Sequence, residues 1–440
     1  MSDTSSFYLS NRAKLMALLP DNSVVIVPSG AEQIRNRDVE FPFRVESDFF
    51  YLTGFSEPDS VLVLVKAQAV ESHLFVRPKD PEQETWQGRR LGVEAATEAL
   101  AIDQAWSIED LDDGVLELLE NIDSVYVSFS QNLDFLGSVH VWISALKQKV
   151  RQGILALKQI CDLDLHLHEL RVIKSDEEIL RMRQAAQISV QGHLAAMQAV
   201  QPGKLEFQVQ AELEATFVRE GSPRVAFNSI VASGENACIL HYTENRDEIK
   251  EGDLVLVDAG AEWQGYAGDI TTTFPANGTF SAAQATLYSL VLAAQQAAIL
   301  AIKPGASYDE AHQASVRVLT QGLLDLGILK GSLDTLIKEE GFKRFFMHGT
   351  GHWLGMDVHD VGVYKQNQCW REFKAGMVVT VEPGLYISAE HVDIDSQWHN
   401  IGIRIEDDIL VTESGHEVLT LGLPRTVDEI ESWMGAKRQS

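Results

Sequence analysis

The chain has few cysteines, few basic residues and no long apolar runs, and each shortage excludes a class of protein. Its three cysteines, Cys161, Cys238 and Cys369, lie far apart and form no CxxC pair, so we expect neither a disulfide framework nor a thiolate zinc site. Lys and Arg total 36 against 64 Asp and Glu, a formal net charge of −28. Binding to nucleic acid or to an anionic membrane surface is therefore not expected, because both need clustered basic residues.

The longest apolar-leaning stretch, Leu287 to Ile302, is interrupted by Gln295 and Gln296 and is too short to span a bilayer. The first residues, Met1 to Ser6, lack the basic and apolar regions of a secretory signal. Together with the scattered cysteines, these features predict a cytoplasmic protein.

A length of 440 residues exceeds one ordinary domain, so two domains are expected. The first part alternates helical patterns, such as residues 108–119, with short β-rich runs, which predicts an α/β domain over residues 1–171. Its predicted strands are residues 23–28, 60–65 and 124–128. A capping box formed by Ser175 and Glu178 then begins a long predicted helix, and with it a second domain, residues 172–440.

The second domain contains an internal repeat. Two predicted helices end in a Pro-Gly pair, at residues 202–203 and 304–305, and each is followed by another helical pattern. Residues 250–260 then align without gaps on residues 374–384, and this alignment matches Asp258 with Glu382. The shared order predicts a duplicated unit of two helices followed by a strand.

Four carboxylates end or line predicted strands in the two copies. Asp258 ends one strand, and Asp269 lies in a second, residues 267–274, after a turn at residues 263–265. We expect Asp258 and Asp269 to face each other across an antiparallel hairpin, where they would repel unless a cation lay between them. Glu382 ends a third strand, and Glu406 ends a fourth.

In the fourth strand, residues 401–406, the isoleucines alternate onto one face, so Gly402, Arg404 and Glu406 share the other. Any one of the four acids alone is more often a surface residue, but together they predict a metal site. The segment that could supply an imidazole is rich in glycine and contains His348, His352 and His359; His241 lies elsewhere in the chain.

No HExxH motif is present, so the zincin type of site is excluded. An oxygen-rich site without thiolate suits two divalent ions, Mn²⁺ first, with Co²⁺, Fe²⁺ or Zn²⁺ as alternatives.

These residues resemble the five metal ligands of the creatinase/methionine aminopeptidase, or pita-bread, metallopeptidases: Asp258, Asp269, His352, Glu382 and Glu406. The similarity extends to the bacterial aminopeptidase P (Xaa-Pro aminopeptidase) group and covers essentially the whole chain. It is carried further by residues 47–55, 84–90, 233–245, 348–364 and 401–408. The resemblance implies an α/β (α+β) fold, with an N-terminal creatinase-like domain for oligomerisation and substrate access before a pseudo-twofold duplicated catalytic domain.

The resemblance also implies a role for each ligand. Asp258 would chelate one ion, Asp269 and Glu406 would bridge both ions, and His352 with Glu382 would complete the other. A bridging hydroxide would attack the Xaa-Pro peptide bond, with Glu382 as the proton acceptor.

Other residues would support this reaction. His241 and His359 would contact the substrate carbonyls or the oxyanion, while His348 and Arg404 would support the ligands. Trp86 either packs within its own chain or resembles the aromatic residue that a neighbouring subunit lends to the active site in this family. A homotetramer or homodimer is implied.

The implied activity releases the N-terminal residue from peptides with proline in the second position. Prolidase, which cuts only Xaa-Pro dipeptides and can hydrolyse organophosphates as a side reaction, would have the same metal site and is the main alternative. Creatinase-type C–N hydrolysis does not need these ligands. A non-catalytic pita-bread binding protein is a further alternative, but such relatives typically lose ligands that this chain keeps.

Overall fold

The computed structural model describes residues 3–131 and 133–437. The chain divides into two compact units, Met1–Leu170 and Arg171–Ser440. Within the described ranges, none of the helices combines the length and the apolar character needed to cross a membrane.

The first unit is built on a six-stranded mixed sheet with the order β6-β5-β4-β1-β7-β8. The β1–β4 and β4–β5 pairs are antiparallel, and the other three pairs are parallel. The strands are β1 Ser23–Pro28, β4 Val61–Lys66, β5 Val70–Val76, β6 Gln104–Ser107, β7 Ser124–Val127 and β8 Gln159–Asp162. The three strands predicted from the sequence are β1, β4 and β7, which confirms them.

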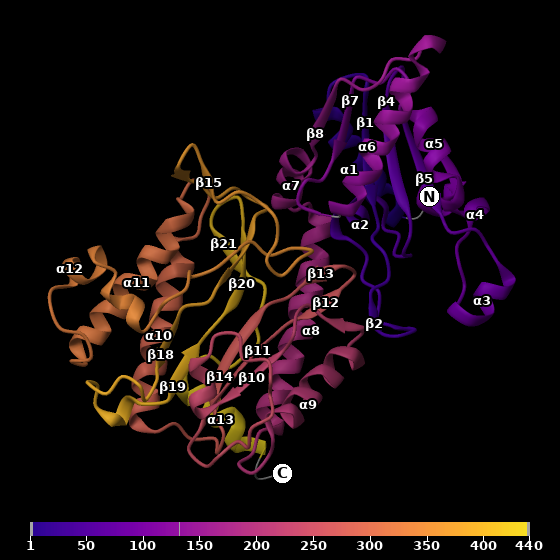
Figure 1. The fold of residues 1–440 in the computed structure, drawn as a ribbon. Helices are drawn as coiled ribbons and strands as arrows, with labels where there is room; N and C mark the ends of the chain where they lie inside the picture. The colour runs from indigo at the N-terminus through magenta and orange to yellow at the C-terminus, as the bar shows by residue number, and fades with distance from the viewer. Residues whose placement is uncertain (1–2, 132, 438–440) are drawn as a thin grey trace. The chain divides into compact units, whose positions relative to one another are not determined.

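Helices flank this sheet, and a small hairpin of β2 Ile34–Asn36 and β3 Val39–Glu40 extends from it (Figure 1). The helices are α1 Asp3–Leu18, α2 Ser47–Thr53, α3 Pro81–Gln87, α4 Val93–Leu100, α5 Leu111–Leu118, α6 Leu133–Gln148 and α7 Asp164–Val172. The helix predicted at residues 108–119 begins as a 3₁₀ turn, Ile108–Asp110, and continues as α5. Branched residues of β1, β4 and β7 pack with Trp142 of α6 in the core.

The second unit contains two packed helix pairs that follow the predicted repeat. They are α8 Asp176–Ala199 with α9 Glu206–Arg219, and α10 Ala282–Ala301 with α11 Tyr308–Asp325. Gly203 (φ 89°) and Gly305 (φ 82°) lie in the turn that follows the first helix of each pair, in a left-handed conformation that glycine adopts without strain. The capping box of Ser175 and Glu178 is also present. The repeated order of helix pair and strand is therefore confirmed.

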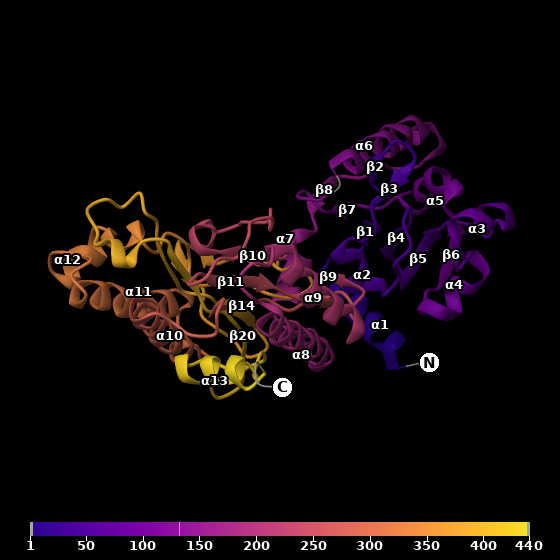
Figure 2. The ribbon, with the colours of Figure 1, turned by 90° about the horizontal axis from the view of Figure 1, so that it is seen from below.

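Antiparallel strands lie between the two helix pairs (Figure 1), and Figure 2 shows α8, α10 and α13 Val427–Lys437 on one side of them. One sheet has the order β10-β11-β14, and its counterpart in the second copy has the order β17-β20-β21. The strands of this unit are β9 Arg224–Val225, β10 Ile230–Ser233, β11 Leu254–Ala259, β12 Ala261–Trp263, β13 Tyr266–Ala267, β14 Ile270–Pro275, β15 Lys365–Gln366, β16 Cys369–Trp370, β17 Val378–Val381, β18 Gly384–Ile387, β19 Ile401–Arg404, β20 Asp407–Val411 and β21 His416–Val418; α12 is Leu333–Lys338.

Candidate metal centre

The first two carboxylates come from neighbouring strands in a register that differs from the predicted one. Asp258 of β11 lies opposite Thr271 of β14, not opposite Asp269. Asp269 precedes β14, because the strand predicted at residues 267–274 is interrupted between β13 and β14. The prediction that the two acids face each other directly is therefore wrong. Asp269 lies two positions before Thr271, one full period of a strand, and both acids still line one cavity.

A close backbone approach accompanies this interruption. The amide of Gly268 donates to the carbonyl of Ala261 at 3.0 Å, and a Cβ at Gly260 would lie 1.6 Å from the carbonyl oxygen of Gly268. No side chain fits at position 260. This glycine lets the backbone next to Asp269 lie against the end of β11.

The second pair of carboxylates lies where the strands of the other copy end. Glu382 follows β17, and Glu406 lies between β19 and β20. The predicted alternation is confirmed, since Ile401, Ile403 and Ile405 are buried in the core while Glu406 lines the cavity. The backbone amide of Glu406 donates to Thr271 O at 3.1 Å, which joins the acids of the two copies.

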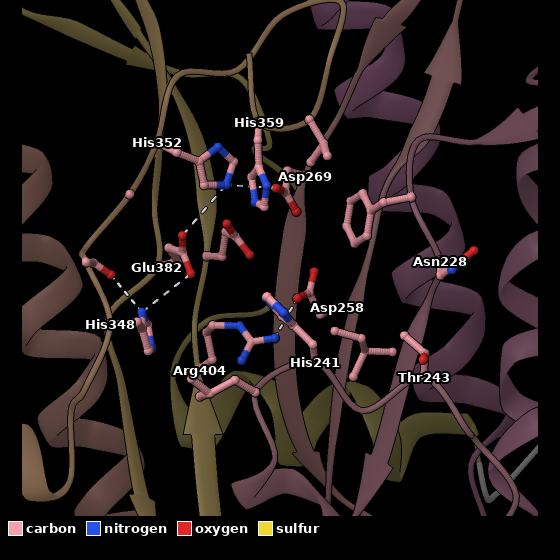
Figure 3. A pocket seen from close by; sticks show the side chains of 17 residues that line it. Asn228, His241, Thr243, Asp258, Asp269, His348, His352, His359, Glu382 and Arg404 are labelled. Carbon is pink, nitrogen blue, oxygen red and sulfur yellow. Dashed lines mark hydrogen bonds and ion pairs between the residues drawn. The ribbon is translucent and has the colours of Figure 1, made fainter. Parts of the chain in front are cut away.

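His352 is held with one ring nitrogen directed at these acids (Figure 3). Its Nδ1 lies 3.0 Å from the carbonyl oxygen of Trp353; because a carbonyl only accepts, Nδ1 carries the proton. Its Nε2 lies 3.4 Å from Asp269 Oδ2 and 3.7 Å from Glu382 Oε1. A histidine that is held through one ring nitrogen and presents the other to carboxylate oxygens has the arrangement of a metal ligand.

The donor set and its unpaired oxygens fit divalent metal ions. Ligand atoms of Asp269, His352 and Glu406 all lie within 4.8 Å of one another. Oδ1 of Asp258 and Oε1 of Glu406 are buried without a hydrogen-bond partner among the described residues. Burial, with repulsion from Asp269 and Asp258, raises the pKa of Glu382 to about 7. Burial and neighbouring acids also raise the pKa values of Asp269 and Glu406 well above normal, so added positive charge would be needed to keep Asp269, Glu382 and Glu406 ionised together.

Arg404 supplies one buried positive charge to this group. Its Nη2 donates to Asp258 Oδ2 at 2.5 Å, and its Nε donates to Thr271 Oγ1 at 3.0 Å. Thr271 in turn donates to Glu406 Oε2 at 2.6 Å. Arg404 therefore contacts Asp258 directly and reaches Glu406 through Thr271, a residue that the sequence reasoning missed. A run of three threonines, residues 271–273, indicates only strand propensity.

His348 lies at the edge of the cavity as a neutral imidazole. Its Nδ1 is 2.7 Å from Gly349 O, so Nε2 accepts from the hydroxyl of Tyr386 at 2.8 Å. Tyr386 accepts from Arg404 Nη1 at 3.1 Å. Burial, followed by the positive charge of Arg404, lowers the pKa of His348 to about 3. Tyr386 was not predicted, since nothing in its local sequence marks it.

The cavity has a volume of about 450 Å³ and also receives His241 and His359. Figure 3 shows both rings directed at the space in front of the carboxylates, with Asn228 and Thr243 further to one side. The rings of His352 and His359 are 4.5 Å apart at an interplanar angle of 81°. Within the described part of the chain, no residue hydrogen-bonds the ring of His241 or His359. Both are available to a ligand.

Trp86 lies on α3 of the first unit and is 84% exposed. It is not among the residues that line the cavity. This exposure leaves Trp86 accessible in the single chain.

Comparison with known proteins agrees with this geometry. The profile of metallopeptidase family M24 matches residues 180–413, and that of the aminopeptidase P N-terminal domain matches residues 8–126. The chain belongs to metallopeptidase family M24. The match of residues 8–126 to the aminopeptidase P N-terminal domain places the chain in the aminopeptidase P group of this family. It confirms the resemblance seen in the sequence.

Full-length relatives of this M24 metallopeptidase agree with the assignment. It is 46% identical over 424 residues to the Xaa-Pro aminopeptidase of Haemophilus influenzae, covering 96% of both chains. A solved aminopeptidase from Pseudomonas aeruginosa has a TM-score of 0.97, with 47% identity and 99% of both chains covered. A zinc-substituted Escherichia coli aminopeptidase P in complex with product has a TM-score of 0.97, with 42% identity and 99% of both chains covered. The predicted fold, an N-terminal α/β domain before a pita-bread catalytic domain, is thereby confirmed.

Proposed function

We propose that this M24 metallopeptidase is a Xaa-Pro aminopeptidase, which releases the N-terminal residue of peptides that carry proline in the second position. One observation carries the proposal: ligand atoms of Asp269, His352 and Glu406 converge within 4.8 Å in a cavity that also presents His241 and His359. Relatives aligned over nearly the whole chain are named Xaa-Pro aminopeptidases, which supports the substrate class.

We infer that the site holds two divalent ions, and Mn²⁺ is the proposed metal because carboxylate oxygen donors outnumber nitrogen donors. Asp258, Asp269, His352, Glu382 and Glu406 would hold them. Bound there, the ions would polarise the scissile carbonyl and lower the pKa of the attacking water.

The side chains of this chain would divide the remaining work. Glu382 takes a proton from the attacking water and returns it to the proline nitrogen as the peptide bond breaks. His241 and His359 hydrogen-bond the carbonyl oxygens of the substrate, including the one that gains negative charge. The buried contact with Arg404 would hold Asp258 in place.

The deciding experiment compares an Xaa-Pro-Yaa tripeptide with an Xaa-Pro dipeptide in the presence of Mn²⁺. An aminopeptidase cleaves the tripeptide efficiently, whereas strong preference for the dipeptide would identify a prolidase. Binding of either peptide without turnover would identify a non-catalytic protein. Treatment with a chelator should abolish cleavage and Mn²⁺ should restore it, with Co²⁺, Fe²⁺ and Zn²⁺ tested in parallel.

We also propose a homotetramer or homodimer in which Trp86 completes the active site of a neighbouring subunit. Its 84% exposure in the single chain supports this role. Mixing Trp86→Ala with Glu382→Ala subunits under exchange conditions should restore activity, since a subunit with intact Glu382 then receives an intact tryptophan. Mixtures that stay as inactive as either variant would refute the exchange. The cytoplasmic location stays a prediction.

A further inference from the structure

The orientation of His359 depends on its backbone. Its ring stacks edge-on against His352, and no described residue hydrogen-bonds it. Asp357, Asp360 and Gly355 belong to the same short loop, which follows the ligand His352. The loop that carries His359 and the ring of His352 are therefore what can hold the His359 ring in position.

The residue next to His359 is held by two buried cations. Asp360 is 6% exposed, and its Oδ1 accepts from Arg171 Nη2 at 2.7 Å while its Oδ2 accepts from Lys174 Nζ at 3.0 Å. The side chains of Arg171 and Lys174 are only 2% and 1% exposed. Arg171 also donates to Asp357 at 2.8 Å, so one guanidinium holds the loop at two points.

Backbone contacts complete the attachment. The amide of Asp360 donates to Trp353 O at 2.9 Å, and the carbonyl of Gly355 accepts from Ala267 N at 2.8 Å. A Cβ at Gly355 would lie 2.1 Å from Asp360 Oδ2, so this glycine leaves room for the carboxylate. The loop is thus joined to Arg171 and Lys174, at the beginning of the second unit, and to β13.

Stability alone does not explain this cluster. Replacing buried ion pairs with apolar residues of similar size is often neutral or stabilising, because desolvation offsets the attraction between the charges. The cluster does specify geometry: two cations of fixed position meet the two oxygens of one carboxylate. Burial would raise the pKa of Asp360, but Lys174 and Arg171 outweigh it and hold that pKa below normal, so the carboxylate stays ionised.

We propose that Arg171 and Lys174 are positioning residues for His359: by holding Asp360 they direct the imidazole at the substrate carbonyl. The inference rests on the proposed peptidase function. It adds that Arg171 and Lys174, at the beginning of the second unit, act on the side of the cavity where His359 would meet the substrate oxygen. Neither cation lines the cavity, so each would act through His359 and not by touching substrate.

The test is a double-mutant cycle of Lys174→Met and His359→Ala in the Mn²⁺-loaded enzyme. Lys174→Met leaves Asp360 paired with Arg171 and should lower kcat/KM for an Xaa-Pro-Yaa tripeptide about 10- to 100-fold. In the His359→Ala background the same change should cost less than about 3-fold, because the group it positions is gone. Lys174→Arg, which keeps the charge, should recover most of the activity. Metal content should not change.

The matched control is Arg183→Met, which removes an exposed Arg–carboxylate pair of the same unit, formed with Glu417, and should leave kcat/KM unchanged. The proposal would be overturned if Lys174→Met lowered kcat/KM by the same factor with and without His359, because the two residues would then act independently. A wild-type kcat/KM in Lys174→Met would overturn it as well. If Lys174→Met fails to fold, Arg171→Lys replaces it in the same cycle.

A readout without turnover separates this inference from the proposed function. The ring resonance of His359 in ¹³C-histidine NMR, assigned by its loss in His359→Ala, should shift or broaden in Lys174→Met and stay in place in Arg183→Met. An unmoved resonance in Lys174→Met would overturn the positioning role even if the peptidase function holds. A wild-type enzyme inactive on both peptides would refute the function alone.

Discussion

Removing metal ions from the site should make the protein less stable as the pH rises. In the metal-free protein, burial and neighbouring acids raise the pKa of Glu382 from 4.5 to about 7 and raise those of Asp269 and Glu406 well above normal. The folded chain therefore binds more protons than the unfolded chain between these pH values. When the folded state holds more protons, the free energy of unfolding falls as the pH increases.

The magnitude can be worked from Glu382 alone. Moving its pKa from 4.5 to about 7 corresponds to about 3 kcal/mol, at 1.36 kcal/mol for each pH unit. This contribution is fully present below pH 4.5 and is lost as the pH rises through about 7. Asp269 and Glu406 shift in the same direction and extend the loss to higher pH. With two divalent ions bound, Asp269, Glu382 and Glu406 would be ionised in the folded state, so this loss should disappear.

Urea unfolding of the chelator-treated and the Mn²⁺-loaded protein at pH 5, 6, 7 and 8 measures the effect. Tryptophan fluorescence follows the second unit through the buried Trp353. The control is Glu382→Gln, which keeps the size of the side chain and cannot titrate. In the metal-free variant, the free energy of unfolding should therefore fall less steeply with pH, by the contribution of this one group. Metal-free stability that stays constant or rises from pH 5 to pH 8, or an unchanged slope in Glu382→Gln, would show that these acids do not set the pH dependence of unfolding.

Three further predictions follow from packing and charge. Gly260→Ala should cost more than about 4 kcal/mol or prevent folding, because its Cβ would lie 1.6 Å from a backbone oxygen; thermal denaturation measures this, and Gly415→Ala, with nothing within 4 Å, should be tolerated. Arg404→Met should destabilise the metal-free protein by about 3–5 kcal/mol, since Asp258 loses its buried partner; equal losses with and without Mn²⁺ would contradict the role of the ions as counter-charges. Glu382→Ala should lower kcat by about 10³-fold or more, measured at saturating substrate with metal content checked, and a near-normal rate would show that another group takes the proton.

Local chemistry made much of the fold predictable. The capping box at Ser175 and the left-handed glycines Gly203 and Gly305 depend on a few neighbouring residues, and the structure contains all of them where expected. The alternation of Ile401, Ile403 and Ile405 needs only the period of a strand. Such features can be predicted because the residues that cause them are adjacent in the chain.

The register of the hairpin that carries Asp258 and Asp269, and the contacts between residues far apart in the chain, could not be predicted from local sequence. The hairpin turns at Gln264 and Gly265, whose φ values are 49° and 81°, and Asp258 would face Asp269 only if the centre of this turn lay one residue earlier in the chain. The hydrogen bond from Thr271 to Glu406 joins residues 135 apart, and nothing near Thr271 in sequence indicates it. The sequence pattern therefore identified the four carboxylates. Their positions relative to one another depend on contacts between the two copies of the repeat, which the pattern does not reveal.

The register of this hairpin also limits how the chain can change in evolution. Asp258 and Asp269 reach one cavity because Asp269 lies one strand period before Thr271, the residue opposite Asp258, and this parity depends on the number of residues between the two acids. Losing or gaining one residue between them would turn the second acid toward the opposite face of the sheet, whereas two residues would restore it. Length variation at the Gln264–Gly265 turn should therefore occur in steps of two among chains that keep both acids, even though the turn itself is distant from the chemistry.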